Sequence, residues 1–124
     1  MKKTKIYFFL VLFGLLLNAC KYDFIVPAEL PQIDTTVPVS FATQITPIFT
    51  SGCVSCHKTG GQAPDLSAAN AYNGIKTMNL FNTKTPESSI IYALPGSSSH
   101  SWKGYSASDA QLVLTWIKQG ALNN

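Results

Sequence analysis

The side chains best suited to covalent and metal chemistry lie together in the segment Cys53-Val54-Ser55-Cys56-His57. The spacing C-x-x-C-H is the attachment pattern of a c-type haem. Two thiols separated by two residues can form thioether bonds to the two vinyl groups on one side of a porphyrin. The adjacent histidine then lies under the iron and supplies the proximal ligand. The motif therefore predicts one covalent haem, bonded to Cys53 and Cys56, with His57 on its iron.

Two other uses of a C-x-x-C pair fit this sequence less well. A redox-active dithiol of the thioredoxin type lies near a βαβ pattern, and no such pattern is visible along this chain. A structural zinc ion takes four Cys or His ligands at set spacings, and the chain has no second C-x-x-C. Both observations favour haem attachment.

Residues 1–19 have the pattern of an export signal. Three lysines precede an uninterrupted apolar run over residues 6–17. Such a run is shorter than the roughly 20 residues of a membrane-spanning helix and matches the apolar core of a signal peptide. Small Ala19 followed by Cys20 resembles a bacterial lipobox, in which cleavage leaves the cysteine as a lipidated N-terminus. We predict a lipoprotein signal over 1–19 and lipidation of Cys20; the alternative is ordinary secretion with a free Cys20 thiol.

Removal of that signal changes the charge balance. The whole chain carries nine lysines, no arginine and six acidic residues. Three of the lysines belong to the signal, so the mature chain has six lysines against six acids and a formal charge of zero. This balance, together with export, argues against a nucleic-acid partner. With Cys20 assigned to lipid and Cys53 and Cys56 to haem, no cysteine remains for the disulfides that exported small domains often use.

The mature chain divides into a tether and one folded unit. Residues 20–39 contain three prolines, which favour an extended linker that holds the domain off the membrane. The alternative is an arm packed on the domain. Residues 40–124 then form one small domain, and a domain of this size buries only a limited fraction of its surface. A large apolar cofactor would supply much of the missing core.

Apolar residues at helical spacing predict a helix just ahead of Cys53. They are Phe41, Ile45, Ile48 and Phe49. Pro47 is the obstacle, because a proline inside a helix costs about 3 kcal/mol. Either the helix kinks there, or Thr46 caps a shorter helix with Pro47 in its first position.

Three further helices are predicted, and no run of residues alternates as a strand does. One begins at Leu66 with Ser67 as its N-cap and ends near Ile75. Another runs from Thr85-Pro86 to Leu94, where Pro95-Gly96 stops it. The best-defined one starts after Ser106, which has Asp109 three residues on in a pattern close to a capping box, and ends before Gly120. The expected fold class is all-α.

Two segments carry a resemblance to a known family. "QITPIFTSGCVSCHK" and "SASDAQLVLTWIKQGALNN" resemble the N-terminal and C-terminal helices of class I cytochromes c, over roughly residues 41–122. In that family the two helices cross at their apolar faces and the haem lies in the pocket between them. The resemblance implies a small helical fold wrapped around one haem c. It also makes Trp116 similar to the aromatic residue at the helix crossing, where we expect it to act as a core residue.

The distal iron ligand departs from the family pattern. Class I cytochromes c usually place a methionine in the loop before the last helix, some forty or more residues after the haem histidine. The mature chain has one methionine, Met78, only 21 residues after His57, whereas His100 follows His57 by 43 residues. We predict His100 as the distal ligand. The alternatives are Met78 and no strong distal protein ligand.

With both axial positions filled, we expect an electron carrier and not an enzyme. The carrier would be a lipid-anchored monohaem cytochrome of the bacterial cell envelope, facing the periplasm or the exterior, that exchanges single electrons with redox partner proteins there. His/His ligation should give a lower reduction potential than His/Met ligation. One alternative is a haem sensor or peroxidase-like enzyme with an open distal site. Another is an accessory subunit whose haem serves a larger envelope complex.

Overall fold

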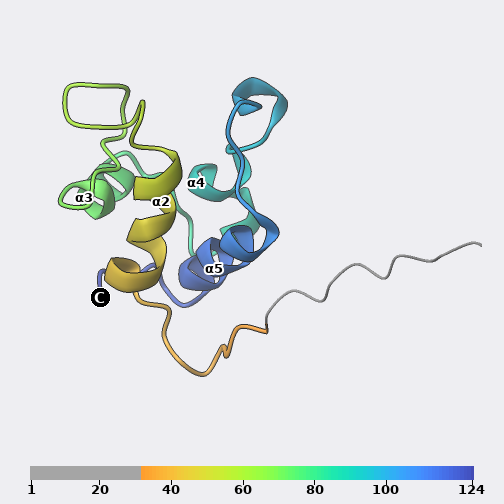
Figure 1. The fold of residues 1–124 in the computed structure, drawn as a ribbon. Helices are drawn as coiled ribbons and strands as arrows, with labels where there is room; N and C mark the ends of the chain where they lie inside the picture. The colour runs from red at the N-terminus through yellow and green to blue at the C-terminus, as the bar shows by residue number, and fades with distance from the viewer. Residues whose placement is uncertain (1–31) are drawn as a thin grey trace, which may run out of the picture.

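The structure is a computed structural model, and it describes residues 32–124 (Figure 1). The signal over 1–19, the lipidation site Cys20 and most of the tether lie outside the described residues. No helix within 32–124 is long and apolar enough to cross a membrane. The helical elements in chain order are η1 (Phe41–Ile45, a π-helical turn), α2 (Thr46–Gly52), α3 (Ala71–Thr77), η2 (Pro86–Ser88, 3-10), α4 (Ile90–Ala93), η3 (Ser98–His100, 3-10) and α5 (Ala107–Lys118). The described part contains no strand, which confirms the all-α class there.

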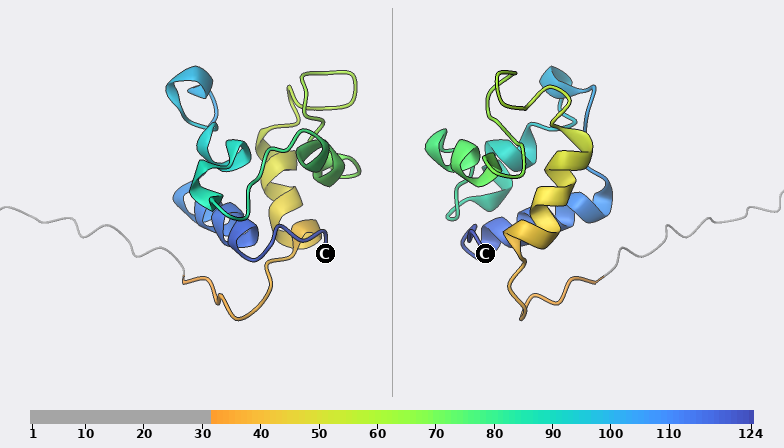
Figure 2. Two further views of the ribbon diagram at one scale, coloured as in Figure 1. Left: turned by 180° about the vertical axis from the view of Figure 1, so that it is seen from behind. Right: turned by 60° about the vertical axis from the view of Figure 1, so that its left-hand side comes forward.

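The core lies where α5 packs against η1 and α2. Trp116 of α5 is 1% exposed, and its ring lies 5.2 Å from that of Phe41, which in turn contacts Phe49 at 6.3 Å between centroids. The indole N–H of Trp116 donates a hydrogen bond to the carbonyl of Leu122 at 2.8 Å. A tryptophan buried with its N–H satisfied contributes large apolar area without an unpaired polar group. Figure 2 shows α2 crossing α5 from the side.

Pro47 is accommodated by a change of winding just before it. The N–H groups of Ile45 and Thr46 reach back five residues, to the carbonyls of Ser40 and Phe41, and so form a widened turn. Pro47 then falls in the first turn of α2, where its missing N–H has no intrahelical partner to lose. The helical path therefore continues through the proline. Of the two alternatives, the one with Thr46 as N-cap is wrong, since Ile45 precedes α2 and no side chain caps it.

Two of the predicted helices differ from the observed ones in their bounds. In each case a serine side chain forms a hydrogen bond that the helix prediction did not include. Ser67 is not an N-cap; its hydroxyl donates to Asp65 at 2.6 Å, and α3 begins only at Ala71. The predicted helix over residues 85–94 is interrupted at Ser89, which has an extended backbone. The hydroxyl of this buried serine accepts a hydrogen bond from the N–H of Asn82 at 2.9 Å.

The last helix agrees with the sequence pattern. The hydroxyl of Ser106 accepts a hydrogen bond from the backbone N–H of Asp109 at 3.1 Å, as an N-cap does. Lys118 is the last residue of α5, and Gly120 follows with φ +101°, a left-handed conformation that glycine adopts without strain.

The described end of the tether lies against the domain as an arm. Val39 is 3% exposed and belongs to the core. The side-chain amide of Gln119 accepts a hydrogen bond from the N–H of Val39 at 2.7 Å and donates to the carbonyls of Thr35 and Val37 at 3.1 Å. The C-terminal residue, Asn124, accepts a further hydrogen bond from the N–H of Ala42 through its backbone carbonyl. The arm is thus tied to the end of α5, and the C-terminal residue is tied to η1.

Candidate cofactor site

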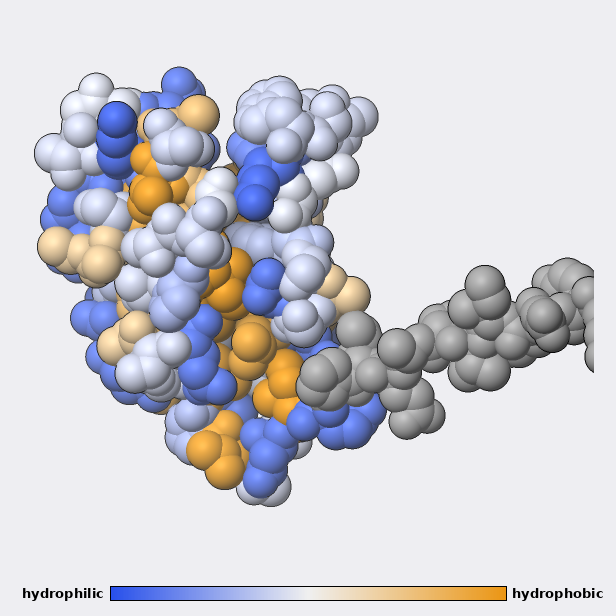
Figure 3. Space-filling model, in the orientation of Figure 1, coloured by the Kyte–Doolittle hydropathy of each residue, from blue (hydrophilic) through white to orange (hydrophobic). Residues whose placement is uncertain are grey.

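A cavity of about 830 Å³ opens between α2, the loop that follows it and the loop before α5. This volume falls in the range of about 300–1,000 Å³ that is typical of cofactor and ligand sites. Figure 3 shows the surface hollowed between two lobes, with apolar side chains at the bottom of the hollow. The five residues considered from the sequence as haem or iron ligands all line this one cavity: Cys53, Cys56, His57, Met78 and His100.

His57 is held in a defined tautomer. It ends the turn that continues α2, with its N–H donating to the carbonyl of Cys53 at 2.9 Å. Its ring Nδ1 lies 3.2 Å from the carbonyl oxygen of Pro64. A carbonyl can only accept, so Nδ1 carries the proton and Nε2 keeps a free lone pair. This is the arrangement that metal-binding histidines use, because the hydrogen bond fixes the ring and raises its basicity.

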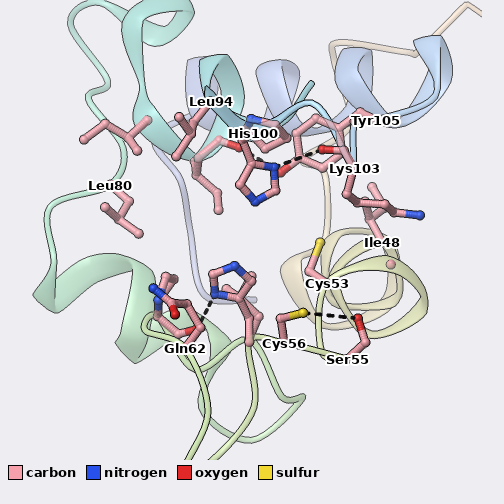
Figure 4. Close-up of a pocket in the computed structure, with 18 of the residues that line it drawn as sticks. Ile48, Cys53, Ser55, Cys56, Gln62, Leu80, Leu94, His100, Lys103 and Tyr105 are labelled. Carbon is pink, nitrogen blue, oxygen red and sulfur yellow. Dashed lines mark hydrogen bonds between the residues drawn. The ribbon is translucent and has the colours of Figure 1, made fainter. Parts of the chain in front are cut away.

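His100 has the same arrangement on the other side of the cavity. It is the last residue of η3, and its Nδ1 lies 3.2 Å from the carbonyl oxygen of Lys103 (Figure 4). By the same reasoning Nδ1 is the donor and Nε2 is free to bind a metal. His100 lies on the loop that carries Leu94 and Tyr105 near its two ends, whereas Cys56 lies on the opposite side of the cavity and Cys53 lies between them.

The two histidine rings face each other at a spacing that fits one metal ion between them. Their centroids are 6.3 Å apart and their planes are inclined by 30°. Two imidazoles bound to one metal through bonds of about 2 Å have centroids about 6 Å apart, once half a ring on each side is added. The separation of the His57 and His100 rings therefore agrees with that of two imidazoles bound to one metal. Met78 also lines the cavity, from the end of α3, with its side chain 47% exposed.

The two cysteines offer free thiols to the same cavity. Cys53 is half-buried, and burial raises the pKa of its thiol, while the positive charge of Lys103 acts in the opposite direction. Cys56 is exposed, with the Ser55 hydroxyl 4.0 Å from its sulfur. Neither thiol is engaged in a disulfide, so both are available for thioether bonds.

Tyr105 forms part of the cavity wall and was not predicted from the sequence. Its hydroxyl donates to the carbonyl of Ile91 at 2.7 Å (Figure 4 shows the ring beside His100). Burial, reinforced by the neighbouring Cys53 and Asp109, raises the pKa of the phenol above its usual range. Tyr105 is therefore a neutral, apolar wall. The carbonyls of Pro64 and Lys103 were missed as well, because a backbone acceptor has no residue-type pattern.

Within residues 32–124, no three His, Cys, Asp or Glu side chains gather as ligands for a free metal ion. A haem iron is bound by the four nitrogens of its porphyrin, so the protein supplies only one or two further ligands. The pair of histidines could meet that requirement, and the two thiols could form the thioether bonds to the porphyrin.

Comparison with known proteins gives no relative: no family model, no curated protein and no solved structure matches this chain. The resemblance to class I cytochromes c thus stays a prediction based on the two segments that carry it.

Proposed function

We propose that this chain is a monohaem c-type cytochrome that carries single electrons in the bacterial cell envelope. Haem would be bonded covalently to Cys53 and Cys56, with His57 and His100 as the axial ligands of its iron. The observation that carries this proposal is the facing pair of histidine rings, 6.3 Å apart, in the cavity that the C-x-x-C-H segment lines. Haem supplies a one-electron couple between ferrous and ferric iron.

The protein would keep the two histidine ligands in fixed orientations while the iron changes between its ferrous and ferric states. Each imidazole is fixed at its outer nitrogen by a carbonyl of the backbone, Pro64 for His57 and Lys103 for His100. These hydrogen bonds make both rings better donors to ferric iron. We therefore expect a lower reduction potential than His/Met ligation would give.

The walls of the cavity would limit the access of water to the iron. Apolar side chains from four different segments line the cavity, and they include Ile48, Leu66, Leu80, Ile91 and Leu94. Leu66 and Ile91 are buried, while Leu94 lies at the opening, 40% exposed. An apolar shell of this kind limits solvent access and stabilises the metal centre in its less charged form.

The predicted lipid on Cys20 would keep the domain near its redox partners. The arm of residues 35–39, tied to Gln119, would orient the domain relative to that anchor. We expect docking with a partner protein to be transient, through an interface of less than about 1,200 Å².

A redox titration of the haem-loaded protein tests this function. We expect one reversible one-electron step, low-spin spectra in both oxidation states, and slow binding of carbon monoxide to the ferrous form, because His100 fills the distal position. Fast binding of carbon monoxide at neutral pH, with a high-spin spectrum before its addition, would overturn the electron-carrier proposal and favour the sensor or peroxidase-like alternative.

A further inference from the structure

Trp102 has a position that core packing does not explain. Its side chain is 72% exposed, so it buries little apolar area in the domain. Its ring nevertheless lies against His100, with 4.5 Å between centroids and 36° between planes. This separation lies at the close end of the range of about 4.5–7 Å that aromatic pairs adopt. This exposed indole thus lies against the imidazole that we assign to the iron.

The backbone around His100 forms a closed loop that holds one edge of the imidazole. The N–H of Gly96 donates to the carbonyls of His100 and Lys103, at 3.0 and 2.9 Å. The loop is narrow at its base, where a Cβ on Gly104 would lie 3.3 Å from the Cα of Gly96. These contacts fix the Lys103 carbonyl, which accepts the hydrogen bond from Nδ1 of His100.

That hydrogen bond restrains rotation of the ring about its Cβ–Cγ bond, but a hydrogen bond tolerates deviations from linearity. The plane of the imidazole can therefore still tilt within that tolerance. Contact of a second ring with its face narrows this freedom. Trp102 supplies the contact on one face of His100, while the ring of His57 lies across the cavity with its plane inclined by 30°.

We infer that Trp102 is a positioning residue for His100, which sets the plane of the distal imidazole relative to that of His57. The inference rests on the proposed bis-histidine site and adds a residue that acts through the ligand. In a low-spin ferric centre, the splitting of the iron d orbitals depends on the angle between the two axial imidazole planes. The g values of the ferric electron paramagnetic resonance spectrum therefore report that angle.

The experiment compares ferric spectra of the haem-loaded protein and three variants. Trp102→Ala removes the ring that contacts His100. Trp102→Phe keeps an aromatic face. Leu122→Ala is the matched control, because Leu122 is also an exposed apolar residue but does not line the cavity. We expect Trp102→Ala to shift the largest g value and broaden the signal, Trp102→Phe to return it toward wild type, and Leu122→Ala to leave it in place.

Three results would overturn the inference: no shift in Trp102→Ala, an equal shift in Trp102→Phe, or an equal shift in Leu122→Ala. Folding does not confound the comparison, since Trp102 lies outside the core and circular dichroism checks each variant. Failure of the proposed function looks different. If His100→Ala has the same ferric spectrum as wild type, the distal assignment is wrong and Trp102 loses its role with it.

Discussion

Gly74 of α3 lies directly against the backbone of Asp65. A Cβ on Gly74 would fall 2.8 Å from the carbonyl oxygen of Asp65 and 3.4 Å from the Cβ of Pro64. The carbonyl of Pro64 is the acceptor that holds His57. The close approach of α3 therefore fixes the segment of backbone that orients the predicted proximal ligand.

Gly74→Ala should destabilise the domain. Alanine is the better helix former by about 1 kcal/mol, but overpacking against a backbone that cannot give way costs about 1–3 kcal/mol. We expect a net loss of about 1 kcal/mol in the free energy of unfolding, measured by urea denaturation. The matched control is Gly52→Ala, whose Cβ would meet the flexible end of Lys103 at 2.6 Å. Lys103 can move aside, so Gly52→Ala should be neutral or slightly stabilising. Equal losses in both variants would contradict this account.

The sequence predicted the elements whose signals are local. Ser106 and Gly120 delimit the last helix because an N-cap side chain and a left-handed glycine act within a few residues of their own position. The interruption at Ser89 was missed, since it depends on a hydrogen bond to Asn82. The two carbonyls that hold the histidines were missed for the same reason, as tertiary folding alone brings them there.

Asp65 should make the free energy of unfolding of the domain depend on pH. Its pKa is held well below its usual range by hydrogen bonds from Ser67, first of all from the hydroxyl, and from Thr59 and Asn70. A lowered folded pKa stabilises the domain above the unfolded pKa of about 4, and that stabilisation fades as the pH falls further. In Asp65→Asn the contribution is absent.

The test is the difference in free energy of unfolding between wild type and Asp65→Asn as a function of pH. We expect wild type to be the more stable at pH 7 and the gap to narrow below about pH 4. Acidic residues elsewhere, such as Asp34 and Glu87, titrate in both proteins and cancel. A gap that stays constant down to acid pH would show that the Asp65 charge contributes nothing.

His100→Ala and Met78→Ala should differ in their effect on the ferric haem spectrum. His100 presents a free Nε2 opposite His57, so its removal should convert the iron toward high spin and speed the binding of cyanide. Met78→Ala should leave the axial ligation unchanged. Visible absorption spectra at neutral pH measure both effects. The reverse outcome would transfer the distal role to Met78 while leaving the covalent haem intact.

Gln119→Ala should release the arm of residues 35–39. The variant loses three hydrogen bonds to that segment, one of them from the partly buried N–H of Val39. Since the hydrogen bond to the Val39 N–H contributes about 1 kcal/mol, we expect amide exchange at Val39 to rise about fivefold in hydrogen-exchange measurements. Lys118→Ala is the control, because its exposed ion pair with Glu87 should contribute little. Unchanged protection of Val39 in Gln119→Ala would mean that the amide of Gln119 does not hold the arm.

The intact mass of the mature protein tests the central claim most directly. The chain would be produced in a bacterium that attaches c-type haem, then measured after full denaturation, beside a double variant with Cys53→Ala and Cys56→Ala. We predict that wild type retains the mass of one haem through denaturation and that the double variant loses it. A wild-type mass without haem, in a host that matures a known c-type cytochrome in parallel, would contradict the account.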